Sequence, residues 1–202
     1  MNSRVAVVVV VHERYLKHLP DTLRTIYRRP WLELVVVGNG CDGEGVTLPI
    51  SETTLAAACN RGIASTDADY IIRVDSDDFI EPALLEIERA HLDDHDVDAV
   101  WCDYWKAWER KGEHHSVWML DYYPQTELEH ACGVMYRREV WERLKYREDL
   151  EYQESFDFWR RFRKAGFRAE RIEMPLYFYR QHQSMSSNVE AREKARQEIL
   201  SG

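Results

Sequence analysis

Three carboxylates follow a short apolar run in the first half of the chain. Residues 70–74 are mostly β-branched and predict a buried strand, and Asp75, Asp77 and Asp78 come directly after it. A proline and the apolar residues beyond it predict a helix that begins near Glu81. Open α/β sheets bind ligands at the carboxyl ends of their strands. Hard oxygen ligands with no thiol nearby favour Mg²⁺ or Mn²⁺, with substrate phosphates completing the coordination shell.

Two simpler interpretations of these acids compete with metal binding. Asp78 and Glu81 have the spacing of a capping box, and acidic side chains stabilise a helix N-terminus. Capping needs only one of the three aspartates, so it leaves the others unexplained. A calcium-binding EF-hand loop is excluded, because Phe79 and Ile80 stand where that loop needs an oxygen ligand and a glycine.

Length and charge limit the classes of protein to which the chain can belong. Its 202 residues fit a single domain with a sizeable core. The net charge of -9 at pH 7 argues against a nucleic-acid groove, which needs clustered Lys and Arg. An anionic phosphate ligand would therefore need a metal that reverses the local charge.

Cysteine usage and hydropathy indicate the compartment. Cys41, Cys59, Cys102 and Cys132 are far apart and contain no CxxC pair, which favours reduced thiols over zinc or disulfides. No stretch is long and apolar enough to be a membrane span, and the first apolar run lacks the cleavage region of a signal peptide. The sequence predicts a cytoplasmic protein and leaves open a peripheral contact with the inner membrane face.

Strand-like and helix-like segments alternate along the first half of the chain. Strands are expected at residues 5–11, 34–37, 47–50, 70–74 and 97–102, and helices at 16–27, 53–63 and 83–92. This order predicts an α/β fold with a mostly parallel central sheet and helices on both faces. The aromatic second half predicts a hairpin turning at 111–112, helices at 138–144, 155–165 and 189–200, and strands at 167–172 and 176–179.

Several short motifs occur in a distinctive order. They are Val35-Val36-Val37-Gly38-Asn39-Gly40, Asn60-Arg61-Gly62, the Asp-rich end of the strand at 70–78, Gly133-Val134-Met135-Tyr136, Glu154-Ser155-Phe156-Asp157-Phe158-Trp159-Arg160, and Tyr179-Arg180-Gln181-His182 followed by Ser184-Met185-Ser186. Together they resemble the motifs of family 2 glycosyltransferases, which have the Rossmann-like GT-A fold. Each motif alone is weak, but their order and spacing over most of the chain make the resemblance specific.

The resemblance implies an enzyme that moves a sugar from a nucleotide-diphosphate donor, with UDP-sugar as the expected class, to a saccharide or other hydroxyl acceptor. It implies inversion at the anomeric carbon, assisted by a carboxylate base and by Mn²⁺ or Mg²⁺. Residues 1–202 would form one glycosyltransferase domain. Its half at 1–103 would bind the nucleotide sugar, and its half at 104–202, with a small antiparallel aromatic part, would bind the acceptor and supply catalysis.

Site residues follow from the positions that match the motifs. Metal ligands are implied at Asp75, Asp77 and His182. Contacts with the nucleotide sugar are implied at His12, Glu13, Asn39, Asn60, Arg61, Asp75 and Ser76. Glu154 and Asp157, at positions i and i+3 near the start of a helix, are expected to share one face and to supply the base jointly.

The chain departs from the family pattern at two places. Ser155 stands where the family commonly has its catalytic acid, so the role passes to Glu154 or Asp157, unless both only cap the helix or activity is lost. Gly38 and Asn39 replace acids that commonly contact the nucleotide base, and a tight turn without a ligand is the other interpretation. A degenerate nucleotide-binding or assembly protein of the same fold is therefore the alternative function.

The aromatic residues of the second half are open to three interpretations. They lie mainly between Trp101 and Tyr123. Indole faces could form a platform on which a sugar acceptor stacks. Aromatic side chains also serve as core residues or as a contact between subunits, so a homo-oligomer is compatible with the sequence.

Overall fold

The computed structural model describes residues 3–41, 45–49, 51, 54–111, 116–131, 133–182 and 189–201. Its strands are β1 (Val5–Val10), β2 (Leu32–Val37), β3 (Val46–Leu48), β4 (Tyr70–Arg73), β5 (Phe79–Ile80), β6 (Ala99–Lys111), β7 (Ser116–Tyr123), β8 (Val134–Arg137) and β9 (Ala169–Gln181). Its helices are α1 (Leu19–Thr25), α2 (Leu55–Ala64), α3 (Leu84–Asp94), α4 (Arg138–Leu144), α5 (Glu154–Lys164) and α6 (Val189–Ser201), with a short 3-10 turn η1 (Glu13–Tyr15).

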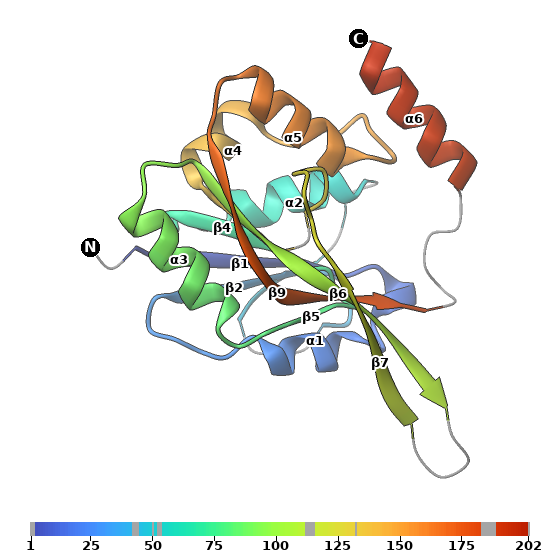
Figure 1. Ribbon diagram of the computed structural model, residues 1–202. Coiled ribbons are helices and arrows are strands. Elements are labelled where there is room, and N and C mark those ends of the chain that lie inside the picture. Colours follow the sequence, from blue (N-terminus) through green and yellow to red (C-terminus); the bar gives the residue numbers. More distant parts are fainter. Residues whose placement is uncertain are drawn as a thin grey trace.

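One curled sheet with strand order β3-β2-β1-β4-β8-β6-β9-β5 runs through the molecule (Figure 1). The strands β1, β2, β3 and β4 are parallel. The strand β8 lies antiparallel between β4 and β6, whereas β9 runs parallel to β6. The prediction of an α/β sheet with helices on both faces is confirmed, and the antiparallel strand β8 joins its two halves.

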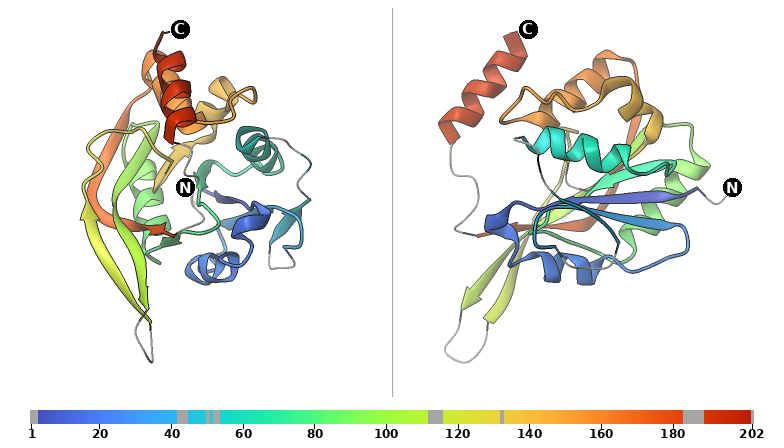
Figure 2. Two further views of the ribbon diagram at one scale, coloured as in Figure 1. Left: turned by 90° about the vertical axis from the view of Figure 1, so that its right-hand side faces the viewer. Right: turned by 180° about the vertical axis from the view of Figure 1, so that it is seen from behind.

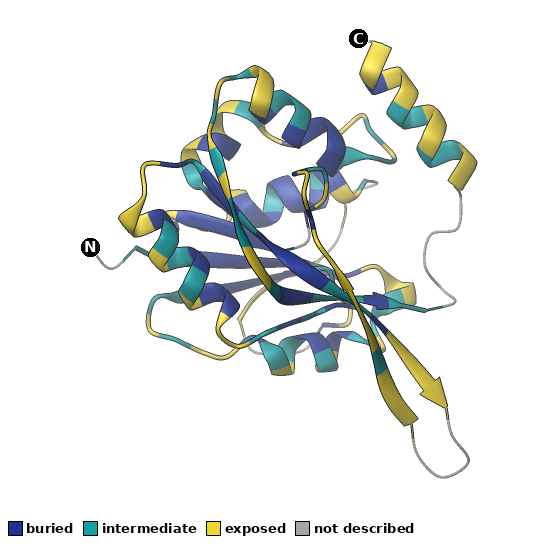
Figure 3. Cartoon of the chain, in the orientation of Figure 1, coloured by how far each residue is buried: buried dark blue, intermediate teal, exposed yellow. Residues whose placement is uncertain are grey.

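Side chains of the central strands point alternately to the two faces of the sheet and pack into two separate cores. Along β1, Val5, Val7 and Val9 face the core covered by α1 and α3, while Ala6 and Val8 face the core covered by α2, α4 and α5. A strand buried on both faces needs apolar residues at every position, which explains its continuous apolar run. Figure 3 shows the central strands as mostly buried, with exposed residues on the outer sides of the helices, in loops and along β7.

Close packing of α2 on the sheet depends on a glycine. A Cβ atom at Gly62 would lie 2.7 Å from Cγ1 of Val8 and 2.9 Å from Cγ2 of Val37. Both distances are too short for real atoms, so a larger residue would push α2 away from the sheet. The glycine of the Asn-Arg-Gly motif therefore sets the distance between the helix and β1.

Several elements differ from the prediction. The strands β8 and β5 were not expected, and α1 is shorter than the predicted helix because η1 precedes it. The two strands expected after residue 166 are one strand, β9, whose pairing with β6 shifts register between Cys102 and Tyr104. That irregularity accommodates Pro175, which lacks an N–H donor, without ending the strand. Residue 112 of the predicted turn and residues 50 and 53 of the predicted elements lie outside the described residues.

The strands β6 and β7 extend beyond the rest of the sheet as a hairpin (Figure 2). The hairpin exposes large apolar side chains: Trp108, Val117, Trp118, Leu120, Tyr122 and Tyr123. The aromatic segment is thus partly core, because Tyr104 is buried in the core that α1 and α3 cover, and partly exposed hairpin. No helix among the described residues is long and apolar enough to cross a membrane.

Candidate active site

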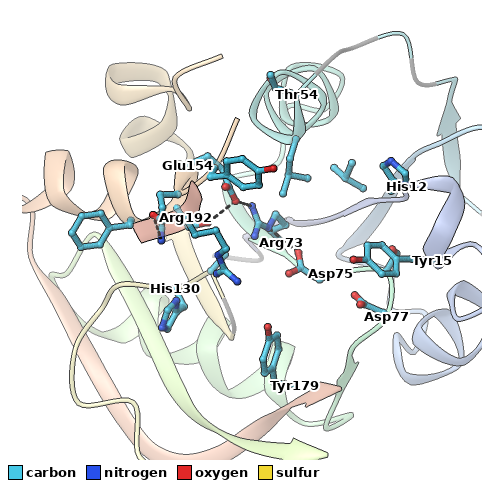
Figure 4. Close-up of a pocket in the computed structure, with 18 of the residues that line it drawn as sticks. His12, Tyr15, Thr54, Arg73, Asp75, Asp77, His130, Glu154, Tyr179 and Arg192 are labelled. Atoms are coloured by element: carbon cyan, nitrogen blue, oxygen red, sulfur yellow. Dashed lines mark hydrogen bonds and ion pairs between the residues drawn. The ribbon is translucent and has the colours of Figure 1, made fainter. Parts of the chain in front are cut away.

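A cavity of about 500 Å³ lies where β1 and β4 end and α5 begins. Its walls include residues from η1, the turn after β4, the start of α5, the loop before β8 and the helix α6 (Figure 4). Side chains of both charges line it, among them Arg73, Asp75, Asp77, Glu154 and Arg192. The cavity thus lies at the carboxyl edge of the parallel strands, where the sequence placed a ligand site.

Arg73 connects two carboxylates of the cavity. Strand alternation turns this last residue of β4 toward the α2 and α5 side, the opposite side from Ile72. Its Nη1 donates to Oε1 of Glu154 at 2.9 Å, and its Nε lies 3.0 Å from Oδ1 of Asp75. A guanidinium buried inside a strand needs such anionic partners, because an unpaired buried charge is costly. Figure 4 shows Arg73 between Glu154 and Asp75.

Glu154 is the first residue of α5 and lines the cavity. The residue before it, Gln153, has a left-handed backbone with φ of 64°, which turns the chain sharply into the helix. Burial acts to raise the pKa of Glu154, but the charge and hydrogen bond of Arg73 outweigh it and lower that pKa. The Ser155 hydroxyl donates to the same Oε1 at 3.0 Å. Glu154 is therefore held ionised, with its carboxylate at the cavity wall.

The three aspartates after β4 have different surroundings. Asp75 and Asp77 line the cavity, and Oδ2 of Asp77 lies 2.8 Å from Nε2 of His182. Asp78 is turned inward, where its carboxylate accepts hydrogen bonds from the Tyr177 hydroxyl and the backbone N–H of Arg180. Since α3 begins only at Leu84, with Ala83 as its N-cap, the capping interpretation of Asp78 is wrong.

The donor set suits a hard or borderline divalent cation. Burial raises the pKa of Asp75, the charge of Arg73 opposes that shift, and the nearby charge of Asp77 adds to it. A cation between the two aspartates would offset their repulsion. Among the described residues, Asp75, Asp77 and His182 do not form one compact group of ligand atoms. The residues therefore fit a metal whose shell is completed by phosphate oxygens rather than by protein alone.

The cavity has further lining residues to which the motifs gave no role. They are Tyr15 of η1, His130, Tyr104 of β6, Tyr179 of β9 and Arg192 of α6. Figure 4 shows Tyr15, His130, Tyr179 and Arg192 around the space next to Arg73 and Asp75. Tyr179 belongs to the Tyr-Arg-Gln-His motif, but the other four are far apart along the chain and form no short motif. The only sequence signal was the cluster of aromatic residues that contains Tyr104.

Of the two acids expected to share one helix face, only Glu154 lines the cavity. Asp157 is 3% exposed and does not line the cavity. Its Oδ2 accepts from Nε of Arg161 at 2.7 Å, and Nη1 of Arg147 lies 3.7 Å from its Oδ1. Arg161 in turn donates to the carbonyls of Leu144 and Lys145. Asp157 thus anchors the loop at 144–148 to α5.

Asn60 was expected to contact the nucleotide, but in the structure it contacts other parts of the chain. Its amide makes four hydrogen bonds, all to residues between 141 and 148. Nδ2 donates to the Tyr146 carbonyl and the Glu148 carboxylate, while Oδ1 accepts from the Trp141 indole and the Tyr146 N–H. A side-chain amide has two donors and two acceptor sites, so its capacity is filled. Asn60 holds α2 to the segment after α4.

The other expected nucleotide contacts divide into two groups. His12 and Ser76 line the cavity, whereas Glu13, Asn39 and Arg61 do not. Nη2 of Arg61 donates to the Pro49 carbonyl on the outer side of α2.

The turn after β2 leaves no space for the acid that the family usually has there. A Cβ atom at Gly38 would lie 2.8 Å from Sγ of Cys41 and 2.8 Å from Cβ of Val11. These contacts are too close for any larger side chain in this conformation. Gly38 has an ordinary φ, and the left-handed backbone of the turn occurs at Gly40, with φ of 69°. Close packing, rather than a positive φ, is therefore what requires glycine at 38.

Comparison with solved structures identifies the fold. Over 98% of this chain and 66% of the other, the structure is similar to Staphylococcus aureus TarS 1-349 in complex with UDP-GlcNAc, with a TM-score of 0.65 and 15% identity. It is also similar to the mannosyltransferase PcManGT from Pyrobaculum calidifontis in complex with GDP-Man and Mn²⁺. That match has a TM-score of 0.64 and 19% identity, and covers 98% of this chain and 62% of the other. The predicted GT-A fold is confirmed.

Sequence comparison identifies the family. The chain is 29% identical over 157 residues to "Putative glycosyltransferase EpsH" of Bacillus subtilis (strain 168), and the match covers 69% of this chain. It spans 45% of that relative, slightly less than half its length. The family model described as "Glycosyl transferase family 2" matches residues 46–176, which include β4, the aspartates after it and the start of α5. The chain belongs to glycosyl transferase family 2.

Proposed function

We propose that this chain transfers a sugar from a nucleotide-diphosphate donor to a hydroxyl acceptor, with inversion at the anomeric carbon. The observation that carries the proposal is that Asp75 and Asp77 from one wall, and Glu154 from another, line the same cavity. One wall can hold a cation and the leaving diphosphate, and the other can take the proton of the acceptor. The residues at 1–103 would hold the donor, and those at 104–202 would supply the acceptor site and the base.

The donor would bind over the turn after β4. His12 and Ser76 line this part of the cavity and can donate hydrogen bonds to ribose or phosphate oxygens. The named complexes of similar structures contain UDP-GlcNAc in one case and GDP-Man in the other. These complexes support a nucleotide sugar as the ligand class. A uridine donor is our proposal, and guanosine is the alternative that an experiment must separate from it.

Asp77, His182 and Asp75 would hold Mn²⁺ or Mg²⁺ together with the diphosphate oxygens. The bound cation would neutralise the charge that develops on the leaving diphosphate. The Mn²⁺ in the complex of the Pyrobaculum mannosyltransferase supports a divalent ion in this fold. The hydrogen bond between Asp77 and His182 holds the His182 ring beside the turn at the end of β4.

Glu154 would act as the general base. It removes the proton of the acceptor hydroxyl as that oxygen bonds to the anomeric carbon, and the bond from that carbon to the diphosphate breaks on the opposite face. Arg73 keeps Glu154 ionised and fixes its orientation. Ser155, where the family commonly has an acid, supports that carboxylate by donating to Oε1. In this proposal Asp157 is a positioning residue rather than a base.

The acceptor would enter between α6 and β9. Tyr104, Tyr179, His130 and Arg192 line that side of the cavity. Tyrosine rings offer apolar faces to the C–H edges of a sugar, and the polar groups can bind its hydroxyls. The exposed tryptophans of the hairpin do not line the cavity, so the platform in this proposal consists of Tyr104 and Tyr179.

The test combines nucleotide binding with turnover. Calorimetric titration of the wild type with UDP and GDP, with and without Mn²⁺, should show metal-dependent binding of one nucleotide. Asp77→Asn should lose that binding, whereas the matched control Asp121→Asn, at an exposed acid of β7, should keep it. The wild type should then release the nucleoside diphosphate from the corresponding nucleotide sugar, slowly by hydrolysis or faster with an acceptor.

Two outcomes would contradict the proposal in different ways. If neither nucleotide binds, the cavity is not a donor site. If a nucleotide binds normally but the wild type and Glu154→Gln release equal traces of diphosphate across a broad acceptor panel, the chain is the nucleotide-binding, non-catalytic alternative.

A further inference from the structure

A histidine of α3, the histidine that follows this helix as its C-cap and a glutamate of β9 gather on the surface away from the cavity. The ligand atoms of His91, His95 and Glu170 all lie within 4.8 Å of one another. None of the three residues lines the cavity. The motifs and the proposed transferase leave this cluster unexplained.

Helix and strand geometry bring these side chains to one place. His91 and His95 are separated by one helical turn, so their rings project from the same side of α3. The rings are stacked, with centroids 4.0 Å apart and an angle of 9° between their planes. Glu170 lies opposite Val100 in the pairing of β9 with β6, and its Oε2 is 2.7 Å from Nε2 of His91.

The hydrogen bonds of His95 leave one ring nitrogen available as a ligand. Its Nδ1 lies 3.0 Å from the backbone carbonyl of His91. A carbonyl oxygen only accepts, so Nδ1 must carry the proton. In the neutral ring the lone pair is then on Nε2. Metal-binding histidines commonly have this arrangement, in which a hydrogen bond to one nitrogen orients the other toward the ion.

The C-terminal end of α3 is held in place by hydrogen bonds from a partly buried arginine. Nη2 of Arg137 donates to the Leu92 carbonyl at 2.7 Å and to the His95 carbonyl at 3.2 Å. Its Nε donates to the Val97 carbonyl at 2.8 Å. The residues that carry the two imidazoles are therefore attached to β8 through Arg137, rather than lying on a free helix end. A fixed backbone lowers the entropy cost of gathering ligands around an ion.

We propose that His91, His95 and Glu170 form a Zn²⁺ site that joins the end of α3 to β9. Two imidazoles and one carboxylate suit zinc, which binds nitrogen and oxygen ligands in a tetrahedron. Mg²⁺ and Ca²⁺ prefer six or more oxygen ligands and fit this set poorly. The site is at the surface, so water can take the fourth position. Zn²⁺ would replace the hydrogen bond that now joins His91 to Glu170.

The site can be tested by titrating ZnCl₂ into the full chain by calorimetry. The donor cavity also contains acids and a histidine, so the titration is run on wild type and on Asp77→Asn. We expect one Zn²⁺ per chain to remain bound in Asp77→Asn. His95→Gln and Glu170→Gln should each weaken this binding at least about tenfold. Glu173→Gln removes a more exposed acid of the same strand and should leave it unchanged.

Folding is checked separately from binding. The melting temperatures of His95→Gln and Glu170→Gln in excess chelator should match that of the wild type, because both side chains are exposed. Zn²⁺ should raise the melting temperature of wild type and Glu173→Gln, but not of the two ligand variants. Anomalous diffraction at the zinc edge should place the ion beside His95. Absence of zinc binding in Asp77→Asn, or equal affinity in His95→Gln, would overturn the proposal. Neither result depends on glycosyl transfer.

Discussion

The first turn of α5 carries two acids with contrasting surroundings. On its cavity side, Glu154 pairs with Arg73 of β4 and lines an open space. On what we call the loop side, where residues 144–148 pack against α2 and α5, Asp157 pairs with Arg161 and Arg147. Only two residues separate them along the helix, yet one carboxylate faces a cavity and the other pairs with two arginines of the chain.

This contrast shows that the use of a carboxylate depends on what packs against it. On the loop side, the polar side chains have partners within the chain. The Asn60 amide makes four hydrogen bonds there, and Arg161 donates to two carbonyls of the loop. The cavity side contains ionised groups whose partners leave them at the surface of a space that a ligand can enter. We therefore expect catalysis to depend on the cavity side and stability to depend on the loop side.

The largest effect should come from Glu154→Gln. The amide keeps the shape of the side chain but cannot accept the acceptor's proton, so turnover should fall by about 10²- to 10⁴-fold. Nucleotide affinity should change little, whereas the melting temperature should fall, because Arg73 loses the charge of one of its two anionic partners and keeps only Asp75. Single-turnover release of nucleoside diphosphate, with melting followed by circular dichroism, measures both.

The matched control is Ser155→Ala. It removes only the hydroxyl that supports Oε1 of Glu154 and should reduce turnover far less than the glutamine variant. Retention of more than a tenth of wild-type turnover in Glu154→Gln would show that the cavity side does not supply the base.

Loss of a buried amide on the loop side should come next. Asn60→Ala leaves the indole N–H of Trp141 and the backbone N–H of Tyr146 without their acceptor. Each buried donor left unpaired costs about 1–3 kcal/mol, so the free energy of unfolding should fall by at least that amount. Urea titration measures the loss, and nucleotide affinity should be unchanged in the folded fraction. If nucleotide affinity is weakened and stability is unchanged, Asn60 contacts the donor instead.

The sequence predicted the parallel half of the fold because that half is coded locally. The apolar run of β1 must be buried on both faces, and the acids after β4 could be assigned to the carboxyl edge without knowledge of distant contacts. The strand β8 was missed because its four residues form a strand only between β4 and β6. Likewise β9 was divided in two at Pro175, since a register shift is a property of the pair and not of one strand.

A site residue could be predicted only where its neighbours in the sequence indicate its role. Arg73 is a charged side chain inside an apolar strand and therefore needs a partner, but only Asp75 is near it in the sequence, and the other partner, Glu154, is 81 residues away. Asp157 and Asn60 lie within family motifs, yet their partners lie in α4, in the loop at 144–148 and at Arg161 of α5, and no motif contains these residues. Spacing along a helix gives an angle around its axis, but not the element that packs against each side.

A smaller loss of stability should follow from Asp157→Asn. The change removes the ion pairs with Arg161 and Arg147. Arg161 keeps its bonds to the loop carbonyls and remains partly solvated, so the cost should be about 1–2 kcal/mol. Turnover measured well below the melting temperature should stay within about threefold of wild type, because a group that does not contact substrate removes little transition-state binding. A loss of turnover comparable to that of Glu154→Gln, at unchanged stability, would place the base on the loop side.

The pH dependence of the cavity side should change with Arg73→Met. In the wild type the pKa of Glu154 is lowered, so the base stays ionised and the acidic limb of the turnover profile should lie below the ordinary glutamate value of about 4.3. The stability that this ionised group contributes is likewise present above the unfolded-state pKa and lost as the pH falls through the folded pKa. Without Arg73, burial and the charge of Asp75 both raise the pKa of Glu154.

The acidic limb of Arg73→Met should then move to higher pH. Turnover measured from pH 4 to pH 9 in folded protein would show the shift as a loss of activity that is recovered at higher pH. Arg161→Met is the matched control, because it removes the equivalent cation from the loop side and should leave the acidic limb in place. Equal shifts in both variants would mean that the titrating base is not the carboxylate that Arg73 holds.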